Sequence, residues 1–381
     1  MTLPEIPVQK NLFNEADESN YLNDQIITYL GNKRALLDFI GEGLSKVKER
    51  VGKAKLRSFD VFSGSGVVSR YLKKHSSYIH SNDLERYAEI TNRCYLSNPE
   101  NLSIKEIHDA ISYINKEASK NPSPGFISEL YAPDDSSNIK QGERVFYTTR
   151  NAMFIDTARQ MIEGFDKRIH DYLIAPLIYR ASVNANTSGV FKGFYKNSDT
   201  GKGQFGGNGK NALSRITKDI YIPFPIFSNY SCNSKVTRSD ANKIVRDPEA
   251  SGFDVAYVDP PYNQHPYGSN YFMLNLIADY KRPKNISKVS GIPKNWNRSK
   301  YNKRKKIGPT FRDLISNIKS RFIMVSYNSE GFIDKDHMLS ILNEFGNVDT
   351  ISTEYNTFRG SRNLNQRNLY VTEYLYLLET K

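Results

Sequence analysis

Cysteine is scarce in this sequence, since only Cys94 and Cys232 occur among 381 residues. Two separated cysteines provide neither a disulfide framework nor the clustered ligands of a zinc site, so we expect a reducing compartment and no bound metal. Nothing approaches the roughly 20 consecutive apolar residues of a membrane span. Residues 1–20 are polar and acidic, unlike a secretory signal. These absences predict a cytoplasmic globular protein without a membrane partner.

Acidic residues are the minority among the charged ones, with 41 Asp and Glu against 53 Lys and Arg and a net charge of +12. This excess indicates a polyanionic partner such as nucleic acid. Residues 281–306 contain eleven Lys or Arg and no acid. Such a run can be a solvated loop. Because Trp296, Tyr301 and several Asn and Ser lie within it, we expect instead a loop that contacts phosphates and bases.

Strand-like and helix-like segments alternate along much of the chain. Apolar positions recur at helical spacing over 32–51. The segments that follow are a strand at 58–62, a helix at 66–75, a strand at 76–83 and a helix at 84–96. Later strand-like runs lie at 253–259, 321–327, 348–353 and 370–379, and a helix at 334–346 separates two of them. The alternation predicts an α/β fold with a doubly wound sheet.

The middle of the chain interrupts this alternation. Residues 99–183 are predicted to be largely helical, whereas residues 186–211 are rich in Gly, Asn and Lys and show no sustained period. Such a stretch is typical of an insertion or a long functional loop. We therefore predict a discontinuous α/β domain, formed by 20–150 and 235–381, with an inserted helix and loop region at 151–234.

A glycine loop follows the first predicted strand, in the stretch "FDVFSGSGVVSRYL". Asp60 stands near the end of that strand, and Gly64 and Gly66 allow a tight turn and a close approach of a ligand. The loop is neither G-x-G-x-x-G nor a P-loop, so no phosphate site is predicted. Asp83 ends the second strand, where a carboxylate can bind the hydroxyls of an adenosine ribose. The same Asp could also cap the helix at 84–96.

The stretch "YVDPPYNQHPYGSN" places a carboxylate at the end of a buried strand. Pro260 and Pro261 have a fixed φ and no N–H, so they end the strand and hold its last carbonyls rigidly. Asp259 and a neighbouring main-chain carbonyl then present two acceptors side by side. Such a pair can hold an amino group by both N–H bonds, and Tyr262 offers a flat face for a ring.

Together these motifs resemble the Dam-type (alpha group) DNA adenine methyltransferases, which use S-adenosylmethionine. The shared order is "YLGNKRALLDFI", the glycine loop, the insert and Asp-Pro-Pro-Tyr. The stretches "DPPYNQHPYGSNYFMLNLIADY" and "VSYNSEG" resemble methylases of restriction-modification systems. The resemblance covers roughly residues 20–380 and implies a Rossmann-like methyltransferase sheet with an inserted target-recognition region.

The resemblance also implies roles for individual residues. The catalytic motif is Asp259, Pro260, Pro261 and Tyr262. The residues expected around the cofactor are Tyr29, Gly31, Asn32, Lys33, Asp60, Phe62, Gly64, Gly66, Asp83 and Asp240, with the first four near its methionine end. The segment "SVNANTSGVFKGFYKN" is similar to a target-recognition region but departs from the family pattern, so no target sequence is predicted. The residues expected to contact DNA are Asn186, Lys192, Lys196, Lys303, Arg304, Lys305 and Lys306.

The resemblance therefore implies transfer of a methyl group from S-adenosylmethionine to the N6 amine of an adenine flipped out of double-stranded DNA. It implies a bacterial or phage protein near the nucleoid, with a possible cognate restriction endonuclease. One alternative is a methyltransferase acting on RNA or on another exocyclic amine. A second is a DNA-binding regulator with an inactive domain, against which the acids at positions 60, 83 and 259 argue. A third is a methyltransferase acting on a small molecule or a protein, against which the net charge of +12 argues.

Overall fold

The computed structural model describes residues 20–207, 209–210, 212–356 and 370–381. Seven strands among these residues form one sheet in the order β3-β2-β1-β4-β5-β7-β6. The strands are β1 (Leu56–Asp60), β2 (Ser76–Asp83), β3 (Asn233–Arg238), β4 (Phe253–Val258), β5 (Ser320–Asn328), β6 (Gly346–Asn356) and β7 (Tyr370–Thr380). The five from β3 to β5 are parallel, and β7 runs antiparallel to both β5 and β6. The predicted doubly wound α/β fold is confirmed.

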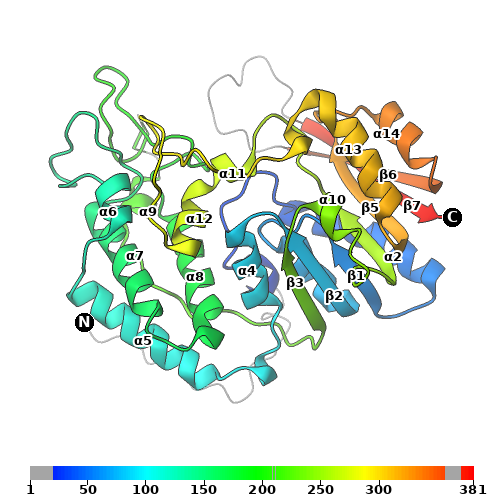
Figure 1. The fold of residues 1–381 in the computed structure, drawn as a ribbon, viewed down its shortest axis with the longest axis horizontal. Helices are drawn as coiled ribbons and strands as arrows, with labels where there is room; N and C mark the ends of the chain where they lie inside the picture. Colours follow the sequence, from blue (N-terminus) through cyan, green and yellow to red (C-terminus); the bar gives the residue numbers. More distant parts are fainter. Residues whose placement is uncertain (1–19, 208, 211, 357–369) are drawn as a thin grey trace.

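Helices cover both faces of this sheet (Figure 1). One apolar cluster joins one face to α2 (Leu37–Val51) and α3 (Val67–His75), and a second joins the other face to α10 (Ala241–Ile244), α13 (Arg304–Asn317) and α14 (Lys335–Leu342). Every residue of β4 is buried, as expected for a central strand between two helical layers. The sequence did not predict β3, because this polar strand at the sheet edge pairs only with β2.

The remaining long helices form a separate layer beside α4 (Arg86–Leu96), on the left in Figure 1. They are α5 (Ile104–Lys120), α6 (Phe126–Tyr131), α7 (Thr149–Ile162), α8 (His170–Val183) and α12 (Phe272–Asp279). Their apolar residues share one cluster with Tyr87 and Tyr95 of α4. Short 3₁₀ helices, η2 (Pro99–Asn101) and η3 (Lys167–Ile169), connect them. The layer thus draws on residues from both sides of position 151.

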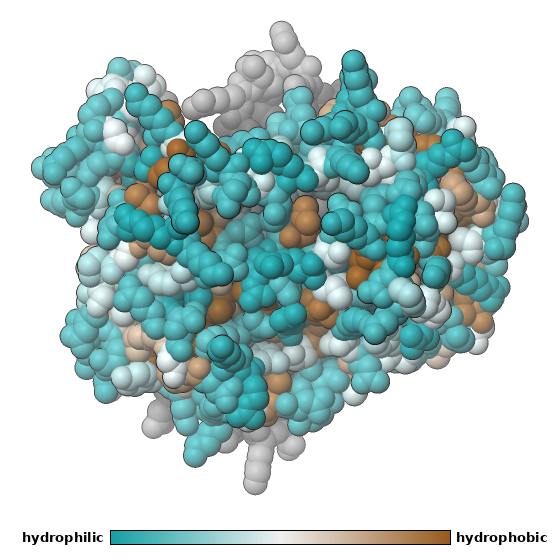
Figure 2. Space-filling model, viewed as in Figure 1, coloured by the Kyte–Doolittle hydropathy of each residue, from teal (hydrophilic) through white to brown (hydrophobic). Residues whose placement is uncertain are grey.

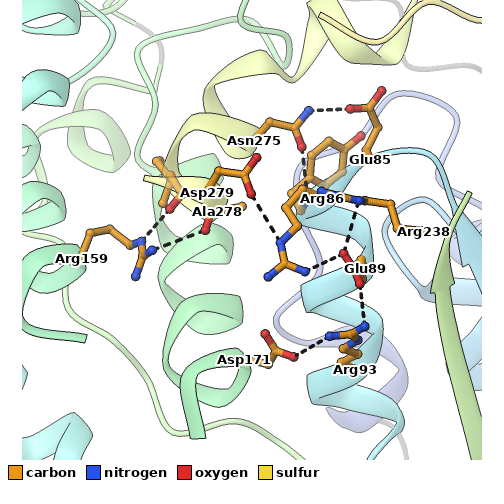
Figure 3. Close-up of polar contacts among 12 residues, drawn as sticks. Glu85, Arg86, Glu89, Arg93, Arg159, Asp171, Arg238, Asn275, Ala278 and Asp279 are labelled. Atoms are coloured by element: carbon orange, nitrogen blue, oxygen red, sulfur yellow. Dashed lines mark hydrogen bonds and ion pairs between the residues drawn. The ribbon is translucent and has the colours of Figure 1, made fainter. Parts of the chain in front are cut away.

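Charged side chains tie the helical layer to the sheet (Figure 3). Glu89 of α4 pairs with Arg86 at 2.6 Å and Arg93 at 2.6 Å, and lies 3.6 Å from Arg238 at the end of β3. Arg86 also lies 3.5 Å from Asp279 at the end of α12. Because α12 follows the Asp-Pro-Pro-Tyr motif after the short α11 (Tyr267–Asn270), this network fixes the motif relative to α4.

The segment between α8 and β3 contains one short helix among its described residues, α9 (Leu213–Thr217). Two other short helices, η1 (Arg34–Leu36) and η4 (Lys300–Asn302), precede α2 and α13. The basic run was predicted to be a loop through residue 306, but α13 begins at Arg304, so its last residues form a helical turn. On the face shown in Figure 2 hydrophilic residues dominate and apolar residues lie in separate small patches.

Candidate active site

Three carboxylates lie at the point where the strand order of the sheet reverses. Asp60 ends β1, Asp83 ends β2, and Asp259 follows β4, the strand on the other side of β1. Doubly wound sheets bind ligands at the carboxyl edge of such a switch point. A cavity of about 920 Å³, including its open mouth, lies there and is lined by all three acids. The position of this cavity at the carboxyl edge is the usual place for a ligand in such a sheet.

The residues predicted to surround a cofactor come together at this cavity. With the exception of Gly66 they all line it, namely Tyr29, Gly31, Asn32, Lys33, Asp60, Phe62, Gly64, Asp83 and Asp240. Gly66 lies at the start of α3, beside the cavity lining. Its φ is +80°, and a Cβ there would lie 2.8 Å from Oδ1 of Asn92. Gly64 has a φ of +50° and its N–H faces the carboxylate of Asp83. The two glycines therefore shape the turn between β1 and α3.

Asp83 connects the glycine loop to the start of α4. Its carboxylate accepts the N–H of Gly64 at 2.8 Å and the N–H of Glu85 at 2.9 Å. The structure thus gives Asp83 a local role at the helix start, while the carboxylate still lines the cavity. Burial raises the pKa of Asp83, and burial also raises the pKa of Glu85 to about 7. Because a nearby positive charge stabilises the ionised form of these carboxyl groups, the cavity favours a cationic ligand.

Asp259 is paired with a cation for which the sequence predicted a different role. Nζ of Lys33 lies 3.4 Å from Oδ1 of Asp259 and 2.8 Å from Oε1 of Glu373 on β7. Lys33 and Glu373 are buried, whereas the side chain of Asp259 is 18% exposed, toward the cavity. Burial raises the pKa of Asp259 to about 7, although Lys33 opposes this. The pKa of Lys33 is well above its usual value because both carboxylates face it.

The remainder of the motif ends β4 as predicted. The strand stops at Val258, directly before Asp259 and the two prolines. Pro261 lines the cavity. The ring of Tyr262 is half-buried, packs edge-on against Tyr327 with ring centres 5.5 Å apart, and has Nζ of Lys33 5.8 Å from its centre.

Tyrosines that were not predicted hold the N-terminal segment against the motif. Tyr29 stacks on Tyr267 and Tyr271, with ring centres 4.9 and 4.7 Å apart. The hydroxyl of Tyr271 accepts the N–H of Leu30 at 2.6 Å, and the hydroxyl of Tyr267 donates to the carbonyl of Leu30 at 3.2 Å. Tyr267 and Tyr271 lie four positions apart in the stretch after Asp-Pro-Pro-Tyr, and this spacing is a signal that could have identified the pair. Tyr267 begins α11, and Tyr271 follows it about one helical turn further on.

The basic run forms one wall of the cavity. Nδ2 of Asn297 donates to Oε2 of Glu85 at 3.0 Å, and the hydroxyl of Tyr301 donates to Oδ1 of Asn242 at 2.8 Å. Asn302 donates to the carbonyl of Asn263 at 2.8 Å, close to the catalytic motif. The polar residues within the run are thus internal partners. The cations predicted to contact DNA remain exposed: Lys303, Arg304, Lys305 and Lys306.

The position of Asn186 does not support the predicted contact with DNA. Its side chain is fully buried and donates to the carbonyls of Val145 at 2.7 Å and Gln204 at 2.8 Å. Its carbonyl accepts the N–H of Gly206 at 3.0 Å. A buried amide with these partners fixes the loop backbone. Lys192 and Lys196, by contrast, are exposed.

Fold and site together define a Rossmann-like methyltransferase. The chain belongs to the family described as D12 class N6 adenine-specific DNA methyltransferase, whose profile matches residues 29–341. It is 30% identical to Type II methyltransferase M.NlaIII from Neisseria lactamica over 93% of this chain and 99% of that protein. It is 28% identical to Type II methyltransferase M.CviAII from Paramecium bursaria Chlorella virus 1, over 92% and 98%.

A third relative is twice as long. Modification methylase StsI from Streptococcus sanguinis is 28% identical over 93% of this chain, which spans 52% of that protein. The family and these relatives make the protein a site-specific DNA adenine methyltransferase of the restriction-modification type, as predicted. They decide against the RNA and regulator alternatives.

Two features are absent from the described part of the chain. Within 20–207, 209–210, 212–356 and 370–381, no helix is both apolar enough and long enough to cross a bilayer. In the same ranges no three His, Cys, Asp or Glu side chains are grouped so that they could hold a metal ion.

Proposed function

We propose that the cavity at the switch point binds S-adenosylmethionine and that Asp259 and the carbonyl of Pro260 hold the N6 amine of the target adenine beside it. The observation that carries this proposal is the exposure of the Asp259 carboxylate into the cavity that Asp60 and Asp83 also line. One cavity thereby joins a candidate cofactor site to a candidate amine site.

The charge of the cavity suits this cofactor, which is cationic at its sulfonium and at its amino group. Oδ1 of Asp60 has no hydrogen-bond partner among the described residues, while Oδ2 accepts from Ser69 at 2.6 Å. Burial raises the pKa of Asp60 to about 7, so a nearby positive charge would be favourable for its ionised form. Asp83 would hold the ribose hydroxyls and Asp240 would lie near the adenine. When bound, the cofactor supplies an electrophilic methyl group.

The protein's own contribution is to position the amine. The lone pair of an adenine amine is delocalised into the ring, so the amine is a weak nucleophile. Two N–H bonds to Asp259 and Pro260 would draw the nitrogen toward a pyramidal geometry and aim its lone pair. Alignment of this kind can contribute about 7–11 kcal/mol to a reaction. The amine becomes acidic as the new bond forms, and the Asp259 carboxylate can accept the proton it loses.

The target base must leave the duplex to reach a carboxylate at the end of a buried strand. Extrusion costs a few kcal/mol. We assign to Tyr262 the stacking on the extruded adenine, which can recover about 1–3 kcal/mol. Its half-buried ring beside Lys33 and Asp259 supports this role.

We assign DNA contacts to two exposed groups of cations. One is the start of α13, with Lys303, Arg304, Lys305 and Lys306, and the other is the loop with Lys192 and Lys196. The catalytic domain would consist of the sheet with its covering helices. The shared apolar cluster of α5 to α8 supports beginning the inserted region near residue 99 rather than 151. Since the relatives include Type II methyltransferases, we also propose that the protein has a cognate restriction endonuclease and acts at the nucleoid in the cytoplasm.

The test has three parts. Expression in a host without DNA methylation, followed by mapping of modified bases, should show N6-methyladenine in one sequence context. A duplex with 2-aminopurine at that adenine should then become more fluorescent when the protein and S-adenosylhomocysteine are added. Cofactor affinity is measured by calorimetry without DNA. If S-adenosylmethionine does not bind, the proposed cofactor site is wrong. If DNA binds without a gain in fluorescence, the proposed extrusion of the base is wrong.

A further inference from the structure

We infer that Glu373 is a positioning residue for methyl transfer, holding Lys33 at a distance from Asp259 that leaves the carboxylate free to accept the amine. This inference rests on the proposed role of Asp259. Glu373 lies on β7, outside the motifs that carry the family resemblance, and 340 positions after Lys33.

The geometry places Lys33 closer to Glu373 than to Asp259. Nζ lies 2.8 Å from Oε1 of Glu373 and 3.4 Å from Oδ1 of Asp259. The first distance is that of a charge-assisted hydrogen bond, and the second is an ion pair without a close hydrogen bond. The ammonium of Lys33 therefore keeps a positive charge near Asp259, while its shorter hydrogen bond is made to Glu373.

Glu373 is itself fixed in place. Its side chain is fully buried, and Oε1 also accepts a hydrogen bond from the hydroxyl of Ser326 on β5. Glu373 pairs with Asn328, the last residue of β5, at the carboxyl end of the β5 and β7 ladder. A buried carboxylate is costly unless it is paired, which is why Lys33 and Glu373 depend on each other. The pair is a fixed part of the sheet that reaches the catalytic edge.

A competing demand on Asp259 explains why the distance matters. If Lys33 bonded Asp259 directly, the ammonium would occupy an acceptor position that the adenine amine needs. If Lys33 were absent, Asp259 would lose the cation that lowers its pKa, so its ionised form, which accepts both N–H bonds, would be less favoured at neutral pH. The groups that face Asp259 are Lys33, Asp60, Tyr257, Tyr262, Tyr267, Tyr355 and Glu373. Lys33 is the cation among them.

The experiment compares pH profiles of single-turnover methylation in the intact protein. Glu373→Gln removes a negative charge that raises the pKa of Asp259 and releases Lys33 toward it. The acid limb should move about one unit to lower pH, because both changes favour the ionised carboxylate. The plateau rate should fall roughly 10–100-fold, since the acceptor is now occupied by Lys33. Affinities for DNA and S-adenosylmethionine should stay within twofold, about the size of a change below 0.5 kcal/mol.

The double variant Lys33→Met with Glu373→Gln guards against misfolding, because it removes both charges of the buried Lys33 and Glu373 pair together. Its acid limb should move the other way, to higher pH, since Lys33 is the main group that lowers the pKa of Asp259. Glu379→Gln is the matched control on the same strand. Glu379 pairs with Arg50 and Arg321 at the surface, so this variant should keep the wild-type profile.

Three outcomes separate the possibilities. Opposite shifts of the two limbs support the inference. Lower melting temperatures without any shift of either limb would reduce Glu373 to a structural residue and overturn it. If Asp259→Ala retains full activity, the proposed role of Asp259 fails, and that failure is distinct from a lack of effect at Glu373.

Discussion

Different kinds of hydrogen bond hold the backbone in the sheet and in the region between α8 and β3. In the sheet, hydrogen-bonded ladders fix the strands, and the acids project from strand ends into one cavity. Between α8 and β3, buried amides replace the ladder. Asn151 donates to the carbonyl of Lys218 at 3.0 Å, Asn184 donates to the same carbonyl at 2.8 Å, and Asn186 bridges Val145 and Gln204.

The difference teaches where chemistry and recognition can vary. A site on strand ends tolerates little change, because each acid is positioned by the register of neighbouring strands. A loop anchored at a few buried amides can change its exposed residues while the anchors stay. We therefore expect the largest losses of activity from variants of the sheet edge, and effects on DNA binding or stability from variants of the loops.

The sharpest test of the comparison is Asp259→Ala. Removing the carboxylate should lower the methylation rate by at least roughly 10²–10³-fold, the scale for the loss of a preorganised polar group in an active site. DNA affinity, measured by gel shift at fixed salt, should be unchanged. A normal rate would remove the catalytic assignment, and loss of the folded state, seen by circular dichroism, would make the residue structural.

Asp83→Ala should weaken binding of S-adenosylmethionine by roughly 10–100-fold, since a hydrogen bond to a charged group is worth about 1.5–3 kcal/mol. Isothermal titration without DNA measures this directly. Asp83→Asn is the closer comparison, because it keeps the size of the side chain and one of the two acceptor oxygens that the N–H groups of Gly64 and Glu85 use. Equal affinity in the alanine variant would leave Asp83 only its local role.

The pH dependence of methylation should follow Asp259, whose pKa burial raises to about 7. The carboxylate must be ionised to accept the amine, so the rate should rise with pH and level off above about 7. Below that value it should fall about tenfold for each pH unit. Single-turnover rates between pH 5 and 9 provide the measurement. A rate that is constant down to pH 5 would mean that Asp259 stays ionised there.

Replacing Lys303, Arg304, Lys305 and Lys306 by alanine should weaken DNA binding and make it less sensitive to salt. The slope of log affinity against log salt should fall by about 0.9 for each phosphate that the protein no longer neutralises. The control removes Lys105, Lys116 and Lys120, which are exposed on α5. Equally weakened binding in both variants would indicate a general charge effect without a defined DNA-binding surface.

The smallest effect on chemistry should come from Asn186→Ala. Because three backbone groups lose a buried partner, stability should fall by about 1–3 kcal/mol in thermal or urea unfolding. The single-turnover rate at saturating DNA should stay close to wild type. Lys192→Ala should show the opposite pattern, with weaker DNA binding and normal stability. A stable Asn186→Ala protein with altered target choice would restore the predicted contact with bases.

Much of the sheet and its acids could be predicted because local patterns determine them. The strand at 76–83 was predicted at its observed bounds, since a continuous run with flanking helices leaves little choice. Asp60, Asp83 and Asp259 were placed correctly because parallel strands bring their carboxyl ends to one edge. No local pattern could pair Lys33 with Glu373, which lie 340 positions apart. Nor could it distinguish a buried Asn186 from an exposed one in a Gly- and Asn-rich loop.

The separation between Lys33 and Glu373 also bears on how the enzyme is made. During synthesis, residue 33 leaves the ribosome long before residue 373 exists, and contacts between such distant positions close the longest loops of the chain. A nascent chain that has already formed β1, β2 and β4 still lacks the glutamate beside Lys33. Maturation of the site should therefore coincide with docking of β7 and give no partly competent enzyme before it.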